Sequence, residues 1–223
     1  MPAEKLTLAV DAERRVSALL DAPPDAFACY VLAHGAGAGM THPSMASVAA
    51  ELAERGIAAL RYQFPYMEQG SKRPDPPALC HATVRAAVAE ARKQLPRLPL
   101  IAGGRSFGGR MTSQAQAKAA LPGVLGLAFL GFPLHPAGKP SDDRAVHLLD
   151  VTIPMLFLQG TRDALAELSL LRSVVERLGK RATLTLFDEA DHSFHVPAKT
   201  GRKDVDVRGE MLDALAAWAR ALI

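Results

Sequence analysis

One serine of this chain stands among glycines where two different sequence patterns meet. Ser106 belongs to Gly104-Arg105-Ser106-Phe107-Gly108, a G-x-S-x-G sequence. The preceding stretch, PLIAGG, is apolar and predicts a buried strand, whereas the following stretch, MTSQAQAKAA, predicts a helix. A serine on such a corner exposes its hydroxyl, and the helix N-terminus offers N–H groups to a developing anion. The pattern indicates a nucleophilic serine; the alternative is a glycine-rich turn with an incidental serine.

A serine hydroxyl is a poor nucleophile at neutral pH, so this chemistry requires a base and a group that orients the base. Asp163 follows the apolar stretch LFLQG, and His192 follows the apolar stretch LTLF further along the chain. Serine, acid and histidine therefore occur in this order, each just past the carboxyl end of a predicted strand. We predict that His192 takes the proton from Ser106 and returns it to the leaving group, while Asp163 orients the imidazole.

Other polar residues near His192 leave alternatives open. The carboxylates of its own loop are more easily interpreted as solvated charges; they are Asp188, Glu189 and Asp191. His195 could replace His192 as the base, although an Asp-His pair directly after the strand fits better. A metal site built from the two histidines with Asp191 or Asp163 is a further alternative. It leaves the serine among glycines without a role, so no metal is expected.

Acyl transfer develops negative charge on the carbonyl oxygen, which N–H donors must stabilise. The N–H of Phe107, directly after the serine, is one predicted donor. The stretch VLAHGAGAGM follows another apolar run and supplies a His-Gly-x-Gly turn, so the N–H of Ala36 is the best second candidate and that of Gly37 the next. Gly35, Gly37 and Gly39 do not complete G-x-G-x-x-G, because position 40 is methionine, and no G-K-[ST] ending follows.

Arginines and apolar residues around the predicted nucleophile are candidates for contact with the substrate. Arginines near it could attract a carboxylate or phosphate, although arginines of such loops are more often surface charges or ion-pair partners; they are Arg105, Arg110 and Arg162. Apolar residues of two long connections could line an acyl pocket or close the top of the core; they are Phe64, Tyr66, Phe132 and Leu134. Those predicted to contact the substrate are Gly37, Arg105, Phe132 and Leu134.

The elements that must position these residues follow from short apolar segments alternating with longer amphipathic ones. Eight strands are predicted, at 6–10, 16–20, 29–33, 58–62, 98–102, 124–130, 155–159 and 183–187. Helices are predicted at 43–55, 79–94, 108–120, 164–178 and 205–222. The first two strands leave no room for a helix between them, so they form an antiparallel edge of an otherwise parallel, doubly wound α/β sheet. Connection 64–77 is predicted to be an ordered surface loop, and 131–150 is too short for a large lid.

Composition limits the class of protein further. With 223 residues the chain can bury one sizeable core, so a single domain over 1–223 is expected. Its net charge of +3 includes no dense basic stripe, so no nucleic-acid partner is expected. No secretory signal or membrane-spanning apolar run is visible, and Cys29 and Cys80 fit reduced packing residues. These features favour a cytoplasmic location without a membrane partner.

Four motifs in order, HGAGAG, GGRSFGG, GTRD and DHSF, resemble the α/β-hydrolase superfamily over nearly the whole chain. More closely, RYQFPY with RPDPP, GGRSFGGRM, and GFPLHPAGKP with Arg144 and His147 look like a small, lidless branch related to dienelactone hydrolases. Members of that branch are commonly described only as predicted hydrolases. The resemblance implies an α/β-hydrolase fold and a Ser-His-Asp triad. Dienelactone hydrolases proper use a cysteine nucleophile where this chain has Ser106.

Together the residues predict a serine hydrolase that cleaves a small or medium carboxylic ester or thioester through an acyl-serine intermediate, without a metal or organic cofactor. Its partner would be a small-molecule substrate. The alternative from another class is a noncatalytic α/β-hydrolase-like scaffold that binds a protein partner. A peptidase is a narrower alternative, but no peptide-binding domain is visible.

Overall fold

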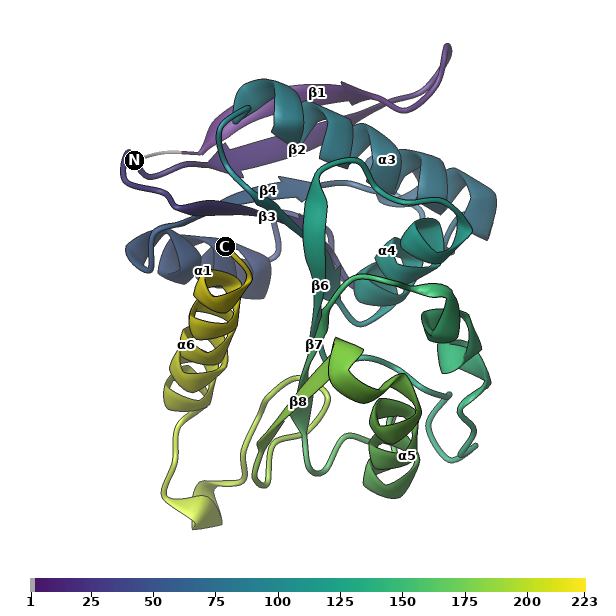
Figure 1. The fold of residues 1–223 in the computed structure, drawn as a ribbon, viewed down its shortest axis with the longest axis vertical. Helices are drawn as coiled ribbons and strands as arrows, with labels where there is room; N and C mark the ends of the chain where they lie inside the picture. Colours follow the sequence, from purple (N-terminus) through teal and green to yellow (C-terminus); the bar gives the residue numbers. More distant parts are fainter. Residues whose placement is uncertain (1–2) are drawn as a thin grey trace.

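A single twisted sheet of eight strands forms the centre of the computed structural model, which describes residues 3–223 (Figure 1). The strands are β1 (Glu4–Ala9), β2 (Arg15–Asp21), β3 (Ala28–Ala33), β4 (Ile57–Tyr62), β5 (Leu100–Arg105), β6 (Val124–Leu130), β7 (Met155–Gly160) and β8 (Ala182–Phe187). Their spatial order is β1-β2-β4-β3-β5-β6-β7-β8. The β1–β2 and β2–β4 pairs are antiparallel, and all other pairs are parallel. The predicted sheet with its antiparallel N-terminal edge is confirmed.

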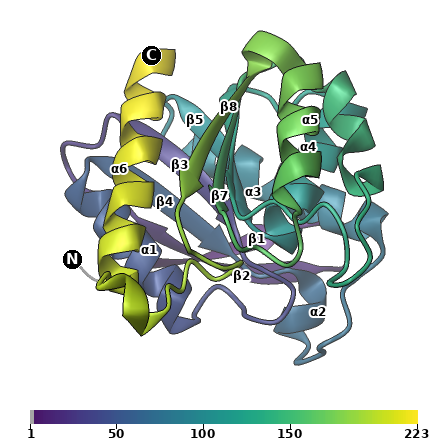
Figure 2. The same cartoon turned by 90° about the horizontal axis from the view of Figure 1, so that it is seen from below.

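Helices cover both faces of this sheet. The α-helices are α1 (Pro43–Glu54), α2 (Pro65–Glu68), α3 (Pro77–Gln94), α4 (Phe107–Lys118), α5 (Leu168–Leu178) and α6 (Asp204–Leu222). The short 3-10 helices are η1 (Asp143–Asp150), η2 (Gly179–Arg181) and η3 (Ala198–Thr200). Figure 2 shows α1 and α6 on one side of the sheet and α3, α4 and α5 on the other. Each side holds its own cluster of buried apolar residues, so the sheet separates two hydrophobic layers.

The central strands are buried along their whole length, as strands of a parallel sheet with two covered faces must be. In β3, β4 and β7 every residue is buried. The edge strand β1, by contrast, buries only one residue. This difference explains why the apolar runs of the central strands are continuous in the sequence. Because β4, β3, β5, β6, β7 and β8 pair in parallel, their carboxyl ends lie at one edge of the sheet, where the predicted site residues follow.

Some boundaries differ from the sequence-based expectation. Strand β5 continues to Arg105, directly before the predicted nucleophile, instead of ending at position 102. Helix α5 begins at Leu168 rather than at position 164, because the intervening residues form a turn in which Leu165 donates its N–H to the Asp163 carboxylate. The connection 64–77 is not a surface loop throughout, because its first residues Phe64, Pro65 and Tyr66 are buried. It contains the short helix α2, which starts at Pro65 because proline is favoured at the first helical position.

The connection between β6 and β7 contains the 3-10 helix η1, which buries Ala145 and Leu148 and packs against α4 and α5. It does not build a lid. Cys29 and Cys80 are both buried, and neither forms a disulfide. Among residues 3–223, no helix combines the length and apolarity needed to cross a membrane.

Candidate active site

The turn between β5 and α4 holds Ser106 in an unusual backbone conformation. Its φ of 49° lies in a region that side-chain-bearing residues adopt at a cost of about 1–3 kcal/mol. A Cβ on Gly104 would lie 2.2 Å from the Ala33 carbonyl oxygen, and one on Gly108 would lie 2.5 Å from the His34 carbonyl oxygen. Both glycines are therefore required by close backbone approach, and they let the strand turn sharply into the helix.

Ser106 and His192 are joined by a hydrogen bond of 2.8 Å between the serine Oγ and the imidazole Nε2. The other ring nitrogen, Nδ1, lies 2.7 Å from Oδ2 of Asp163. A carboxylate only accepts hydrogen bonds, so Nδ1 carries the ring proton and the unprotonated Nε2 accepts from the hydroxyl. The Asp163 side chain is fully buried, whereas that of His192 is 21% exposed. The three side chains thus form a hydrogen-bonded chain that can remove a proton from the serine.

Gln159, near the end of β7, holds the Asp163 carboxylate in place. Its side-chain N–H donates to Oδ2 of Asp163, and its carbonyl oxygen accepts from the Phe132 N–H at 2.8 Å. The second carboxylate oxygen accepts from the Leu165 N–H at 2.8 Å. Sequence reasoning did not single out Gln159. Its signal was a polar side chain near the end of an otherwise apolar strand, where burial requires a partner.

The alternative residues of the histidine loop are engaged elsewhere. His195 pairs with Asp204 at 2.9 Å. Asp191 closes its own loop by accepting from the N–H groups of Ser193 at 2.7 Å and His195 at 3.0 Å. Glu189 pairs with Arg162 at 3.4 Å, and Asp188 is exposed. Within residues 3–223, no group of three or more histidine, cysteine or acidic side chains is arranged to hold a metal ion.

The N–H groups predicted to stabilise an oxyanion lie in two adjoining turns. Those of Ala36, Gly37 and Phe107 donate to no other part of residues 3–223. The turn after β3 is held by Tyr66, whose hydroxyl donates to the Ala36 carbonyl oxygen at 2.9 Å and whose ring packs edge-on against that of Phe107, 6.3 Å away. Tyr66 therefore fixes the peptide unit that carries the Gly37 N–H and contacts the start of α4.

Two buried histidines each connect a pair of loops at this edge of the sheet. His34 accepts the Phe64 N–H at Nε2 (3.0 Å) and donates from Nδ1 to the Gly35 carbonyl oxygen (2.7 Å). Burial lowers the pKa of His34 to about 4, so its ring is neutral near pH 7 and has one donor and one acceptor nitrogen. His135 repeats the arrangement by accepting the Glu167 N–H at 3.0 Å and donating to the Pro136 carbonyl oxygen at 2.9 Å.

The residues predicted to contact substrate fall into two groups. Gly37 is exposed, and Arg105 is partly buried at the side of the site. Phe132 and Leu134, however, are 0% exposed and belong to the hydrophobic core, where Phe132 packs against Phe129 and Phe157. They present no surface to a ligand in this structure, because burying these large side chains completes the core beneath the loop. The structure therefore does not bring them into an acyl pocket.

Taken together, an eight-stranded α/β sheet and a serine at a strand–helix corner define a lidless hydrolase fold. A family described as "Alpha/beta hydrolase domain" matches residues 26–220, and the chain belongs to this family. The sequence-based recognition of an α/β hydrolase is confirmed.

Solved structures of similar fold come from several bacteria. A lidless α/β serine hydrolase from Xanthomonas campestris is 24% identical with a TM-score of 0.75, covering 98% of this chain and 95% of that one. An α/β serine hydrolase homologue from Coxiella burnetii is 16% identical with a TM-score of 0.76, covering 96% and 98%. A dienelactone hydrolase from Anabaena variabilis is 20% identical with a TM-score of 0.72, covering 98% and 96%. At these identities the likeness concerns the fold.

Proposed function

We propose that this protein is a serine hydrolase that cleaves a small or medium carboxylic ester or thioester. The observation that carries the proposal is the hydrogen-bonded chain from Asp163 through His192 to Ser106. In this mechanism the Ser106 oxygen attacks the ester carbonyl while His192 takes its proton, and the proton then passes to the departing alcohol or thiol. Water, activated by the same imidazole, releases the acid from the acyl-serine.

Charge on the carbonyl oxygen would be stabilised by the N–H of Phe107 together with that of Ala36 or Gly37. These groups support the proposal because they donate to nothing else among the described residues. The absence of a lid favours substrates that enter without a large closure. Both ester and thioester leaving groups are compatible with this arrangement, because neither requires a partner beyond His192.

Covalent labelling of the purified protein by a fluorophosphonate tests the proposal directly. We expect one adduct by intact mass, located on Ser106 by peptide mapping and absent in Ser106→Ala. Ser173→Ala, which removes an exposed hydroxyl of α5, is the matched control and is expected to label like the unmodified protein. On p-nitrophenyl esters and acyl thioesters that the unmodified protein hydrolyses, Ser106→Ala should have a kcat lower by about 10³-fold or more.

The opposite outcome favours the noncatalytic scaffold. If protein with a cooperative thermal transition takes up no label and hydrolyses nothing in the panel, the hydrogen-bonded chain does not activate Ser106. Undiminished turnover by pure Ser106→Ala would equally overturn the assignment of the nucleophile.

A further inference from the structure

The last strand of the sheet, β8, has one neighbouring strand in the part of the chain that the structure describes. It pairs in parallel with β7, and its other side is the free edge of the sheet. In Figure 2 this strand lies between α6 on the left and α5 on the right. The Phe187 carbonyl oxygen accepts the Thr161 N–H at 3.0 Å, so the backbone groups of Phe187 face β7. Because successive residues of a strand alternate in this direction, those of Leu184 and Leu186 face the free edge.

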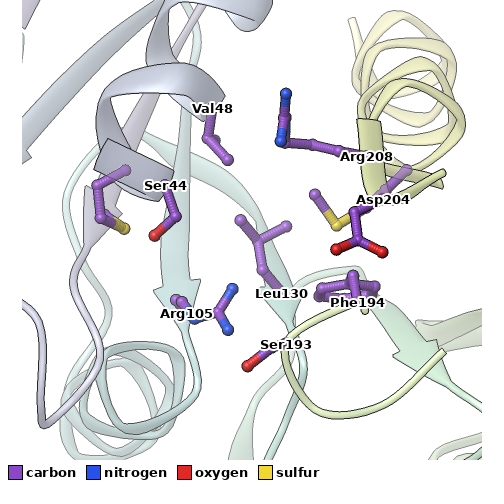
Figure 3. A pocket seen from close by; sticks show the side chains of 10 residues that line it. Ser44, Val48, Arg105, Leu130, Ser193, Phe194, Asp204 and Arg208 are labelled. Atoms are coloured by element: carbon purple, nitrogen blue, oxygen red, sulfur yellow. The ribbon is translucent and has the colours of Figure 1, made fainter. Parts of the chain in front are cut away.

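No described segment forms backbone hydrogen bonds with this free edge. The outward N–H and carbonyl groups of Leu184 and Leu186, and the carbonyl oxygen of Ala182, have no backbone partner among the described residues. The loop after β8 folds toward α1 and α6 instead. Figure 3 shows Ser193 and Phe194 of this loop beside those two helices, where they line a cavity. The loop thus packs on one face of the sheet and leaves the backbone groups of the free edge without partners.

The side chains of β8 do not protect its free edge either. Edge strands can pair with further strands, and charged residues or prolines within them normally prevent this. The edge strand on the opposite side of the sheet, β1, carries the exposed charged residues Glu4 and Lys5. Strand β8 has the sequence ATLTLF, which contains neither a charged residue nor a proline. Its threonine and apolar residues suit pairing with another strand.

Opposite charges flank β8. Lys180 precedes the strand and Asp188 follows it; both are exposed, and neither forms an ion pair among residues 3–223. Their neighbours Arg181 and Glu189 already have partners within the chain. Antiparallel pairing of two copies brings the amino end of one strand beside the carboxyl end of the other. When Leu184 lies opposite its own copy, Lys180 therefore lies opposite Asp188 at both ends of the contact.

The same register matches the remaining residues of β8. Leu184 lies opposite Leu184, Ala182 opposite Leu186, and Thr183 opposite Thr185 of the second copy. Apolar pairs and threonine pairs across antiparallel strands are favourable, and no like charges face each other. Leu184 exchanges both backbone hydrogen bonds with its own copy, and the Leu186 N–H donates to the Ala182 carbonyl oxygen. The free edge is thus complementary to itself in backbone, side chains and charge.

We propose that the free edge of β8 binds a second copy of this chain, with the two β8 strands antiparallel about a two-fold axis and the two sheets joined into one. Because each copy uses the same edge, the contact closes on itself and association stops at a dimer. The inference goes beyond the proposed function and does not depend on it, since no residue of β8 belongs to the Ser106, His192 and Asp163 chain.

Sedimentation velocity over a concentration series tests this pairing. We expect a reversible monomer–dimer equilibrium with a dissociation constant below about 100 µM, as suits a contact of limited area. Lys180→Glu and Asp188→Lys each place like charges at both ends of the contact. Each should raise the dissociation constant by about 3- to 30-fold at low salt, and less at high salt. The double variant Lys180→Glu/Asp188→Lys restores opposite charges and should dimerise like the unmodified protein.

A control variant and amide hydrogen exchange locate the contact. Lys5→Glu reverses an exposed charge on the edge strand β1 and is expected to leave the equilibrium unchanged. The amides of 182–187 should exchange more slowly above the dissociation constant than below it, whereas those of β1 should not change.

Three outcomes would overturn the proposal. A protein that stays monomeric at about 300 µM does not bind a second copy through β8, and the free edge is then left to a different partner. A dimer that neither single charge reversal weakens uses another surface. Association beyond the dimer shows that β8 pairs with a surface other than itself, because a self-complementary edge closes at two copies.

Discussion

Acidification tests the neutral state of His34. The ring must accept the Phe64 N–H and donate to Gly35, so the added proton of an imidazolium would face another donor. Burial lowers the pKa of His34 from its ordinary 6.5 to about 4. The unfolded chain therefore binds more protons than the folded one in this window. The stability that His34 contributes is complete above its unfolded pKa and is lost as pH falls through the folded pKa.

The size of the loss follows from the folded and unfolded pKa values of His34. A tenfold difference in proton affinity between the two states corresponds to about 1.4 kcal/mol, and linkage gives a loss of about 2 kcal/mol between pH 7.5 and pH 5, and about 3 kcal/mol by pH 4. His34→Gln keeps a donor and an acceptor but does not titrate. We expect this variant to have a lower free energy of unfolding at pH 7.5, because an amide side chain fits the two hydrogen bonds of the imidazole less well. Its free energy of unfolding should nevertheless fall less toward acid pH, by the amounts given above.

Urea unfolding followed by circular dichroism across this pH range measures the difference between the two slopes. The pKa of His147 is also lowered to about 4 by burial, but its titration occurs in both proteins and cancels in the comparison. The reasoning is refuted if wild type and His34→Gln lose the same free energy of unfolding between pH 7.5 and pH 4.

Two other substitutions address the groups that position the site. Gln159→Leu leaves a buried N–H without its acceptor and removes a donor from Asp163; we expect a loss of about 1–3 kcal/mol in urea unfolding and a lower kcat with little change in KM. Unchanged kcat would show that the acid needs no such support. Tyr66→Phe removes the hydrogen bond to the Ala36 carbonyl oxygen; we expect kcat/KM to fall by up to about tenfold in steady-state assays, and a full-rate variant would contradict the anchoring role.

The sheet could be predicted because its strands obey a simple rule of burial. Continuous apolar runs such as that of β7 are required where helices cover both faces, and all eight predicted strands are present. The start of α5 could not be found in the same way. Residues 164–167 have helical composition, but hydrogen bonds to the side chains of Asp163 and His135 hold a turn there instead.

The candidate site was predictable because the carboxyl ends of parallel strands lie at the same edge of a sheet. That rule brings Ser106, Asp163 and His192 together in the structure, while their catalytic roles stay predictions. Gln159 escaped notice because its partner Phe132 lies 27 residues away in sequence and only the paired strands bring the two together. For Phe132 itself, the sequence permitted a pocket wall or a core residue, and only packing distinguishes the two.

The hydrogen bonds by which the His34 and His135 side chains join loops affect how easily these loops could move when a ligand binds. Moving a loop that either histidine holds would leave a backbone N–H and a ring nitrogen buried without a hydrogen-bond partner. Each unpaired group would cost about 1–3 kcal/mol of free energy. The loops that these two histidines join are thus ordered when the chain folds, and little of their conformational entropy remains to be lost on binding. A ligand that needs either loop to move must therefore supply this free energy itself when it binds.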